Sequence, residues 1–209
     1  MTTTDTERAY LRIKDKIIKT ELMPGAVIKE TDLMETLSFG RTPIREALKQ
    51  LQIEDLVVVK PRRGIFVSDV AITDLLQLFE IRVELEALSI RLAIKRITAE
   101  QLTELNNLAK AYAQIDTKDK RELIELDSKF HFLIAEASRN KFLRHDIEHY
   151  YNLSTRIWYL VIDLTTPEDI DIKAHFTILK AIEAGEADKA VEAITRHIKD
   201  FHTTMKRCI

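Results

Sequence analysis

The sequence is poor in residues that interrupt helices and almost lacks cysteine. Four glycines and four prolines occur in 209 residues, and the single cysteine, Cys208, is the penultimate residue. An internal disulfide and a cysteine-based metal site are therefore excluded, which suits a reducing compartment. No stretch approaches the roughly 20 apolar residues that cross a membrane, and the N-terminus contains no apolar core of a secretion signal. We expect a cytoplasmic protein with no membrane segment.

The composition is that of an ordinary folded protein. Hydrophobic residues make up 45% of the chain, and the net charge is only −2 at pH 7. Apolar residues recur at helical spacing, apart from one short stretch rich in Val, Ile and Phe. We therefore predict a mainly α fold. The length permits two small domains, and we place their boundary between residues 68 and 69.

Residues 1–68 contain three predicted helices. The first ends near Met23-Pro24-Gly25, the second spans about Glu30 to Leu37, and the third begins at Arg41. One face of the third helix is apolar, at spacings of three and four residues: Ile44, Ala47, Leu48 and Leu51. Its opposite face carries cations and a hydroxyl: Arg41, Thr42, Arg45 and Lys49. Such a face suits phosphates and base edges, so we interpret this segment as the recognition helix of a helix-turn-helix.

A short β-hairpin is predicted after the recognition helix. Two β-prone runs, Val57-Val58-Val59 and Ile65-Phe66-Val67, flank a loop that contains Arg62, Arg63 and Gly64. A hairpin with a basic tip can reach phosphates beside the recognition helix. Each charge taken alone is better explained as surface solvation, but the whole ordered set favours a winged helix-turn-helix that binds DNA.

These segments resemble a known family. The runs PGAVIKETDLMETL, RTPIREAL and PRRGIFV are similar to the winged helix-turn-helix of GntR-type regulators over about residues 8–68. The resemblance implies that Arg41, Thr42 and Arg45 contact DNA and that Gly64 lets the wing approach the groove. One departure matters, because Ser38-Phe39-Gly40 stands where the family usually has Gly-Val-Ser. Gly40 is a weaker helix cap than serine and offers no hydroxyl to a phosphate.

Residues 69–209 are predicted to form an all-α bundle of about six helices. The expected ranges are 72–95, 99–114, 119–138, 141–162, 168–184 and 187–206. Polar residues interrupt the inward stripes of three of these helices: Asp127 and His131, His175, and His197. Burying such groups is costly unless they have partners. One carboxylate and three imidazoles suit a first-row divalent ion, so we predict a site for Zn, Ni, Mn or Fe, with a slight preference for Zn.

Other interpretations of the histidines remain open. Taken singly, each of the three histidines is more easily explained as a hydrogen-bonded core residue. It is their combination with Asp127 that favours a metal. His145, His149 and His202 lie on less clearly apolar faces and are interpreted as surface or structural residues.

The second region also resembles a known domain. The runs DSKFHFLIAEASRN from Asp127, AHFTILKAIEAGEADKA from Ala174 and RHI from Arg196 are similar to the FCD ligand-binding domain of the FadR-like branch, over about residues 71–205. The resemblance implies a metal held by Asp127, His131, His175 and His197, and a small organic-acid or sugar-acid effector that completes its coordination. Arg82 and Arg156 are candidates to pair with that acid, although a salt bridge explains each equally well.

The sequence thus favours a homodimeric, ligand-responsive transcription regulator. Two recognition helices would occupy the half-sites of a pseudo-palindromic double-stranded operator, and repression is expected because most relatives are repressors. Two alternatives stay open. A regulator that senses the metal itself would need no organic effector, and a metalloenzyme would use the ion to activate water. The enzyme is disfavoured because no general base is apparent beside the ligands and the DNA-binding unit would have no purpose.

Overall fold

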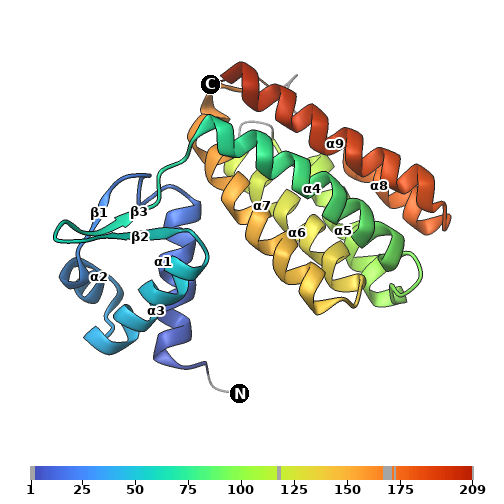
Figure 1. Ribbon diagram of the computed structural model, residues 1–209. Helices are drawn as coiled ribbons and strands as arrows, with labels where there is room; N and C mark the ends of the chain where they lie inside the picture. The colour runs from blue at the N-terminus through green and yellow to red at the C-terminus, as the bar shows by residue number, and fades with distance from the viewer. Residues whose placement is uncertain (1–2, 117–118, 167–170, 172, 209) are drawn as a thin grey trace. The chain divides into compact units, whose positions relative to one another are not determined.

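The computed structural model describes residues 3–116, 119–166, 171 and 173–208, which form two compact units. The first extends to Ala71 and the second begins at Ile72 (Figure 1). Helices predominate, and the predicted fold class, a winged helix-turn-helix followed by a helical bundle, is confirmed. No helix among the described residues is both long enough and apolar enough to span a membrane.

The N-terminal unit combines three helices with a small antiparallel sheet. Its elements are α1 (Asp5–Ile18), β1 (Val27–Ile28), α2 (Glu30–Leu37), α3 (Arg41–Ile53), β2 (Val57–Lys60) and β3 (Gly64–Val67). The strand order is β1-β3-β2, with β3 paired to both neighbours. The hairpin of β2 and β3 was predicted, whereas β1 was not, because two residues are too few to show an alternating pattern.

The core of this unit lies between α1 and α3. A capping box of Thr4 and Glu7 starts α1. The predicted apolar face of α3 is buried: Ile44, Ala47, Leu48 and Leu51. The predicted end of α1 was too late, since the helix stops at Ile18 and Thr20 takes a left-handed conformation (φ +57°). The Pro24-Gly25 turn therefore follows a short loop, not the helix itself.

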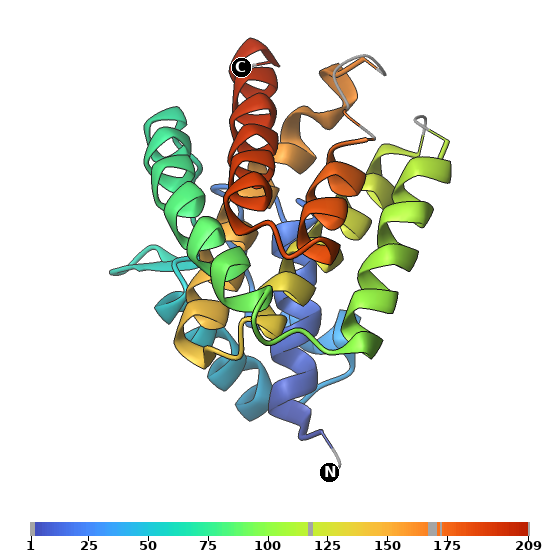
Figure 2. The same cartoon turned by 90° about the vertical axis from the view of Figure 1, so that its right-hand side faces the viewer.

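The C-terminal unit is an all-helical bundle. Its elements are α4 (Ile72–Ala93), α5 (Ala99–Gln114), α6 (Lys120–Ala137), α7 (Lys141–Val161), the short 3₁₀ helix η1 (Ile162–Leu164), α8 (Ala174–Glu183) and α9 (Ala187–Cys208). Helix α6 packs against α4, α5 and α7, so ten of its residues are buried. Helices α4 and α9 run side by side (Figures 1 and 2), and α8 packs against both α5 and α9. This packing brings α6, α8 and α9 together.

Helix α8 begins later than predicted. We expected a helix from residue 168, but α8 starts at Ala174; residues 168–170 and 172 lie outside the described part of the chain. The side-chain carboxylate of Asp171 accepts a hydrogen bond from the backbone N–H of Lys173 at 2.9 Å. The backbone carbonyl of Asp171 accepts a second one from the backbone N–H of Ala174 at 3.2 Å. Such local side-chain bonds compete with helix formation, so the helix starts after Asp171.

Candidate metal centre and DNA-binding surface

The polar face of α3 is available to a partner. Arg41, Thr42, Arg45 and Lys49 are all exposed, on the side of α3 that faces away from its buried stripe. Arg45 lies 3.5 Å from Glu30 and Lys49 lies 2.8 Å from Glu46, both as solvent-exposed ion pairs. Exposed pairs contribute little, so a phosphate can replace these carboxylates at small cost. The structure thus brings the four predicted residues to one accessible surface.

The tip of the wing joins β2 to β3. Arg62 and Arg63 are exposed there, and Arg62 (φ +62°) and Gly64 (φ +107°) have left-handed backbones. A Cβ atom at position 64 would meet no heavy atom within 4 Å, so backbone conformation and not crowding favours glycine. The tip is therefore a tight basic turn with room for a partner to approach.

The four predicted metal ligands converge in the C-terminal unit. Asp127 and His131 come from α6, His175 from α8 and His197 from α9. Each offers one ligand atom, and these atoms all lie within 4.8 Å of one another. Three of the four residues are buried and His197 is half-buried. A spacing of four residues places Asp127 and His131 on the same side of α6.

The distances suit a common ion. Asp127 Oδ1 lies 3.1 Å from His175 Nε2 and 3.3 Å from His197 Nε2, while Oδ2 lies 3.8 Å from His131 Nε2. Ligands about 2.1 Å from one ion lie roughly 3 to 3.5 Å apart. The Nε2 atoms of His131 and His175 are buried and form no aligned hydrogen bond among the described residues. Buried nitrogens normally have partners, so these two fit a metal as their missing partner.

A second layer of residues, which the sequence analysis missed, orients the ligands. Glu86 on α4 is hydrogen-bonded to His131 Nδ1, and Tyr151 on α7 donates its hydroxyl proton to Asp127 Oδ2. Metal-binding histidines usually have such a carboxylate on the other ring nitrogen. The sequence did contain a signal for Glu86. This residue lies on the same inward stripe of α4 as Phe79, so it is a polar residue at a position that should be apolar, as Asp127 is on α6. Tyr151 carries no comparable signal.

Arg82 belongs to this layer as well. Its Nε and Nη2 atoms donate to Glu86 Oε1 at 2.9 and 2.7 Å, and Nη1 donates to Ser154 at 2.9 Å. The two-nitrogen edge that was predicted to pair with a ligand carboxylate is thus directed at Glu86. In this buried ion pair the positive charge of Arg82 balances the negative charge of Glu86 and holds its carboxylate beside His131. A role for Arg82 in ligand binding stays a prediction.

The pKa shifts of His175, Glu86 and Asp127 favour the protonation states that a bound cation requires. Burial lowers the pKa of His175 to about 4, so its imidazole is neutral at pH 7, as a metal ligand must be. Burial raises the pKa of Glu86, but His131 and Arg82 outweigh it and lower that pKa to about 2. Burial also disfavours the charged form of Asp127, yet its histidine neighbours hold its pKa well below the usual range. Both carboxylates are therefore ionised.

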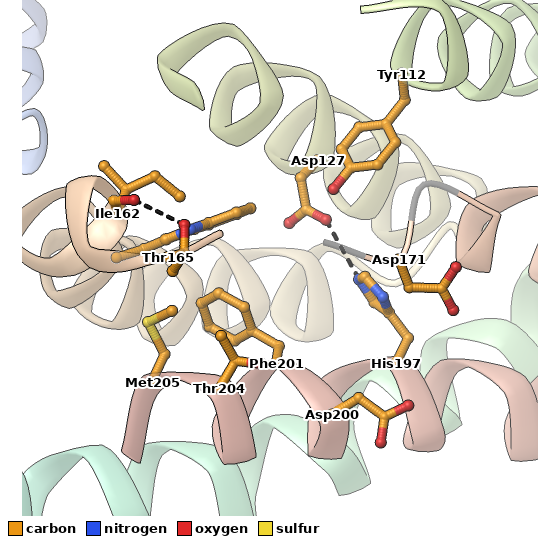
Figure 3. Close-up of a pocket in the computed structure, with 11 residues that line it drawn as sticks. Tyr112, Asp127, Ile162, Thr165, Asp171, His197, Asp200, Phe201, Thr204 and Met205 are labelled. Carbon is orange, nitrogen blue, oxygen red and sulfur yellow. Dashed lines mark hydrogen bonds and ion pairs between the residues drawn. The ribbon is translucent and has the colours of Figure 1, made fainter. Parts of the chain in front are cut away.

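A cavity of about 50 Å³ opens beside two of the ligands, Asp127 and His197. The rest of its wall consists of Tyr112, Trp158, Ile162, Thr165, Asp171, Asp200, Phe201, Thr204 and Met205 (Figure 3). A buried water needs about 10–15 Å³, so the space suits a ligand of a few heavy atoms. A smaller cavity of about 10 Å³ also adjoins Asp127 and His197 and is bordered by Arg82 and Tyr151.

The remaining predicted residues lie elsewhere. Arg156 is buried on α7 and is not among the residues that line these cavities, so its predicted role in ligand binding stays a prediction. His145 is exposed and His149 is half-buried. The ring of His202 packs 4.5 Å from that of Phe79. None of these three histidines belongs to the group that Asp127 forms with its neighbours.

Comparison with known proteins agrees with both units. Residues 5–67 match the bacterial regulatory proteins of the gntR family, and residues 77–200 match the FCD domain. The chain is 24% identical to the HTH-type transcriptional repressor RspR of Escherichia coli (strain K12), over 96% of this chain and 89% of the relative. It is 30% identical to the HTH-type transcriptional repressor GlaR of the same strain, over 90% of each chain.

The fold agrees with a solved structure. E. coli McbR/YncC superimposes with a TM-score of 0.89 and 23% identity, over 99% of each chain. The domain matches cover both units described above, and RspR and GlaR are named as transcription regulators. This chain therefore belongs to the GntR family of bacterial regulatory proteins, as a DNA-binding transcription regulator with a C-terminal FCD domain.

Proposed function

We propose that this regulator is a repressor whose affinity for its operator is controlled by a small organic acid bound at a divalent metal in the C-terminal unit. The observation that carries the proposal is the convergence of one carboxylate and three imidazoles beside a cavity. The relatives RspR and GlaR, which are named repressors, support the direction of control.

The DNA is contacted by α3 and the wing. Arg41, Thr42 and Arg45 provide donors to phosphates and base edges, and Lys49 adds a cation on the same face. Arg62 and Arg63 contact phosphates flanking the half-site, where Gly64 allows close approach. One such surface reads only one half-site, so a second chain is required for a pseudo-palindromic operator.

The exposed face of α4 supports pairing of two chains. Ile81 and Leu88 are 36% and 43% exposed on this face. Glu84 lies one turn before Leu88 and Arg91 lies one turn after it, and both are exposed. Two antiparallel α4 helices that cross near Leu88 would therefore bring each Glu84 beside the Arg91 of the second chain. Apolar contact with complementary charges is typical of a two-fold interface.

Asp127, His131, His175 and His197 would hold the ion. When bound, a divalent metal supplies a positive centre that attracts an anionic ligand. Glu86 fixes the ring of His131 by its hydrogen bond to Nδ1, and Tyr151 holds one oxygen of Asp127 so that the other faces His175 and His197. Tyr112 and Phe130 pack against the ring of His175 and keep water from it.

The effector would enter the cavity that borders Asp127 and His197. Its volume of about 50 Å³ suits a small acid. Thr165 and Thr204 offer hydroxyls to the polar groups of that acid, while Trp158 and Phe201 cover its carbon skeleton. Helix α9 contributes both His197 and Phe201, so occupancy of the cavity acts directly on α9.

Elemental analysis of the purified protein tests the metal. We expect about one transition-metal ion per chain in the wild type and none in a His131→Ala/His175→Ala double variant. Thermal melts against a panel of small organic acids should then show stabilisation of the wild type only. A wild type that stays metal-free after incubation with Zn²⁺, Ni²⁺, Mn²⁺ and Fe²⁺ would refute the metal centre.

Selection from a pool of random duplexes tests the DNA-binding half. The recovered sequences should contain an inverted repeat, and the acid that stabilises the protein should release it from that repeat. Recovery of unrelated sequences with no common element would contradict sequence-specific binding. Enhanced binding with the acid would refute the proposed direction of control.

One observation favours a metal sensor as the second candidate. Among the described residues, the wall of the 50 Å³ cavity contains three carboxylates, Asp127, Asp171 and Asp200, and no Lys or Arg. Such a wall is less favourable for an organic anion than for a cation. A metal sensor predicts that affinity for the selected operator follows metal occupancy and does not respond to any acid in the panel.

A further inference from the structure

The turn between α2 and α3 carries an aromatic ring that two arginines of α1 cover. The ring belongs to Phe39, in the segment Ser38-Phe39-Gly40. The guanidinium carbon of Arg8 lies 5.6 Å from the ring centroid, and that of Arg12 lies 5.7 Å from it. Both distances are within the range of a cation–π contact. The ring thus collects two positive charges at one point of the N-terminal unit.

This arrangement is unfavourable for folding by itself. Arg8 and Arg12 are four residues apart on α1, and like charges at that spacing repel each other. Both arginines are exposed. Arg8 pairs only with Asp5, which is also exposed, and Arg12 forms no ion pair within the described ranges. Contact with the ring offsets part of the repulsion, and an anion bound between the arginines would remove the rest.

The pair also lies close in the chain to the start of the recognition helix. Phe39 comes directly before Gly40, the N-cap residue of α3, and two residues before Arg41. Gly40 makes no side-chain capping hydrogen bond, so the first N–H groups of α3 receive no side-chain cap from this residue. A phosphate beside these N–H groups would lie in a region made positive both by the helix terminus and by the two arginines.

We propose that Arg8 and Arg12, held by the ring of Phe39, form an additional phosphate-binding site beside the N-terminus of α3. The ligand is a backbone phosphate of the DNA that α3 reads, so this assignment rests on the proposed DNA-binding function. The site supplies the contact that a capping serine hydroxyl at position 40 would otherwise make. Arginine suits this role because its planar group can stack on a ring and still donate to phosphate oxygens.

The salt dependence of DNA binding tests the proposal. The affinity of the full chain for a fluorescent 30-base-pair duplex of mixed sequence is measured by anisotropy over a series of salt concentrations. Each phosphate contact contributes about 0.9 to the slope of log affinity against log salt, so an Arg8→Ala/Arg12→Ala variant, which removes the site for one phosphate, should lose about 0.9. The matched control, Lys16→Ala/Lys19→Ala, removes two cations from the other end of α1 and should keep the wild-type slope.

A Phe39→Leu variant separates positioning from charge. It keeps both arginines and an apolar side chain but removes the aromatic face, and binding should weaken about two- to fivefold. If the Arg8→Ala/Arg12→Ala variant keeps the wild-type slope, the site does not exist. In that case an Arg41→Ala/Arg45→Ala variant that loses affinity shows that the DNA-binding function stands without it. A wild type that fails to bind the duplex at any salt concentration overturns both.

Discussion

The hydroxyl of Tyr151 is a single group whose removal tests the metal centre without disturbing its packing. Phenylalanine at this position keeps the ring, which contacts Phe132 at 4.9 Å between centroids and lies 4.3 Å from the guanidinium of Arg82. The hydrogen bond to Asp127 Oδ2 is lost, together with the contact of the hydroxyl with Ser128. A Tyr151→Phe variant therefore leaves Asp127 in place but free to rotate.

The size of the effect follows from the role of that hydrogen bond. Removal of a group that orients a metal ligand typically lowers metal affinity about 10- to 100-fold. Tyr151 holds one oxygen of one ligand, so we expect the lower end, about tenfold or about 1.4 kcal/mol. In the metal-free protein, loss of a hydrogen bond to a charged group costs about 1.5–3 kcal/mol of unfolding free energy.

Competition with a chromophoric chelator for Zn²⁺ measures the affinity, and thermal unfolding of the metal-free protein measures the stability. The matched control is Tyr150→Phe, which changes the neighbouring, half-buried tyrosine of α7. It should alter neither quantity. Zn²⁺ binding by Tyr151→Phe within a factor of about two of the wild type would show that Asp127 is not a ligand oriented by Tyr151, and the reasoning would be refuted.

Three further outcomes are expected. Burial lowers the pKa of His131, but Glu86 and Asp127 outweigh it and raise that pKa. Because a metal-binding imidazole must be deprotonated, metal binding should release protons, seen as a buffer-dependent heat in calorimetry, and affinity should fall as the pH is lowered; a heat independent of buffer would contradict this. Leu88→Glu should convert the proposed dimer to a monomer in light scattering, and an unchanged mass would exclude α4 as the interface. Gly64→Ala should lower the unfolding free energy by about 1–3 kcal/mol because φ is +107°, whereas Gly40→Ala, at φ −69°, should cost less because only the N-cap preference for glycine over alanine is lost; equal effects would contradict the backbone argument.

The sequence was informative where a polar residue interrupts an apolar stripe. Asp127, His175 and His197 could be found because each occupies an inward position of a helix, and the structure brings them together. Glu86 occupies a similar position on α4, but its Arg82 neighbour four residues before it resembles an ordinary surface pair. The stripe of α4 therefore contains a signal for Glu86, but only tertiary packing shows that Arg82 is buried with it.

Local competition explains the late start of α8. The ends of α4 and α7 follow hydrophobic periodicity and were predicted to within two residues. The start of α8 was not, because the hydrogen bonds around Asp171 depend on a conformation that periodicity does not report. The position of Tyr151 against Asp127 is a long-range contact between α7 and α6, and neither helix contains a pattern that specifies it.

The placement of the four ligands has a consequence for how the bundle holds together. They lie on α6 and on two consecutive helices, α8 and α9, that come well after it in the chain. A bound ion would act as a cross-link that fastens this terminal hairpin to the centre of the bundle. Without it, the hairpin is held by side-chain packing and by the contacts of His175 and His197 with Asp127, and its local opening costs less free energy than unfolding of the whole domain. The metal would then control how often the hairpin of α8 and α9 opens, in addition to providing a binding site for the effector.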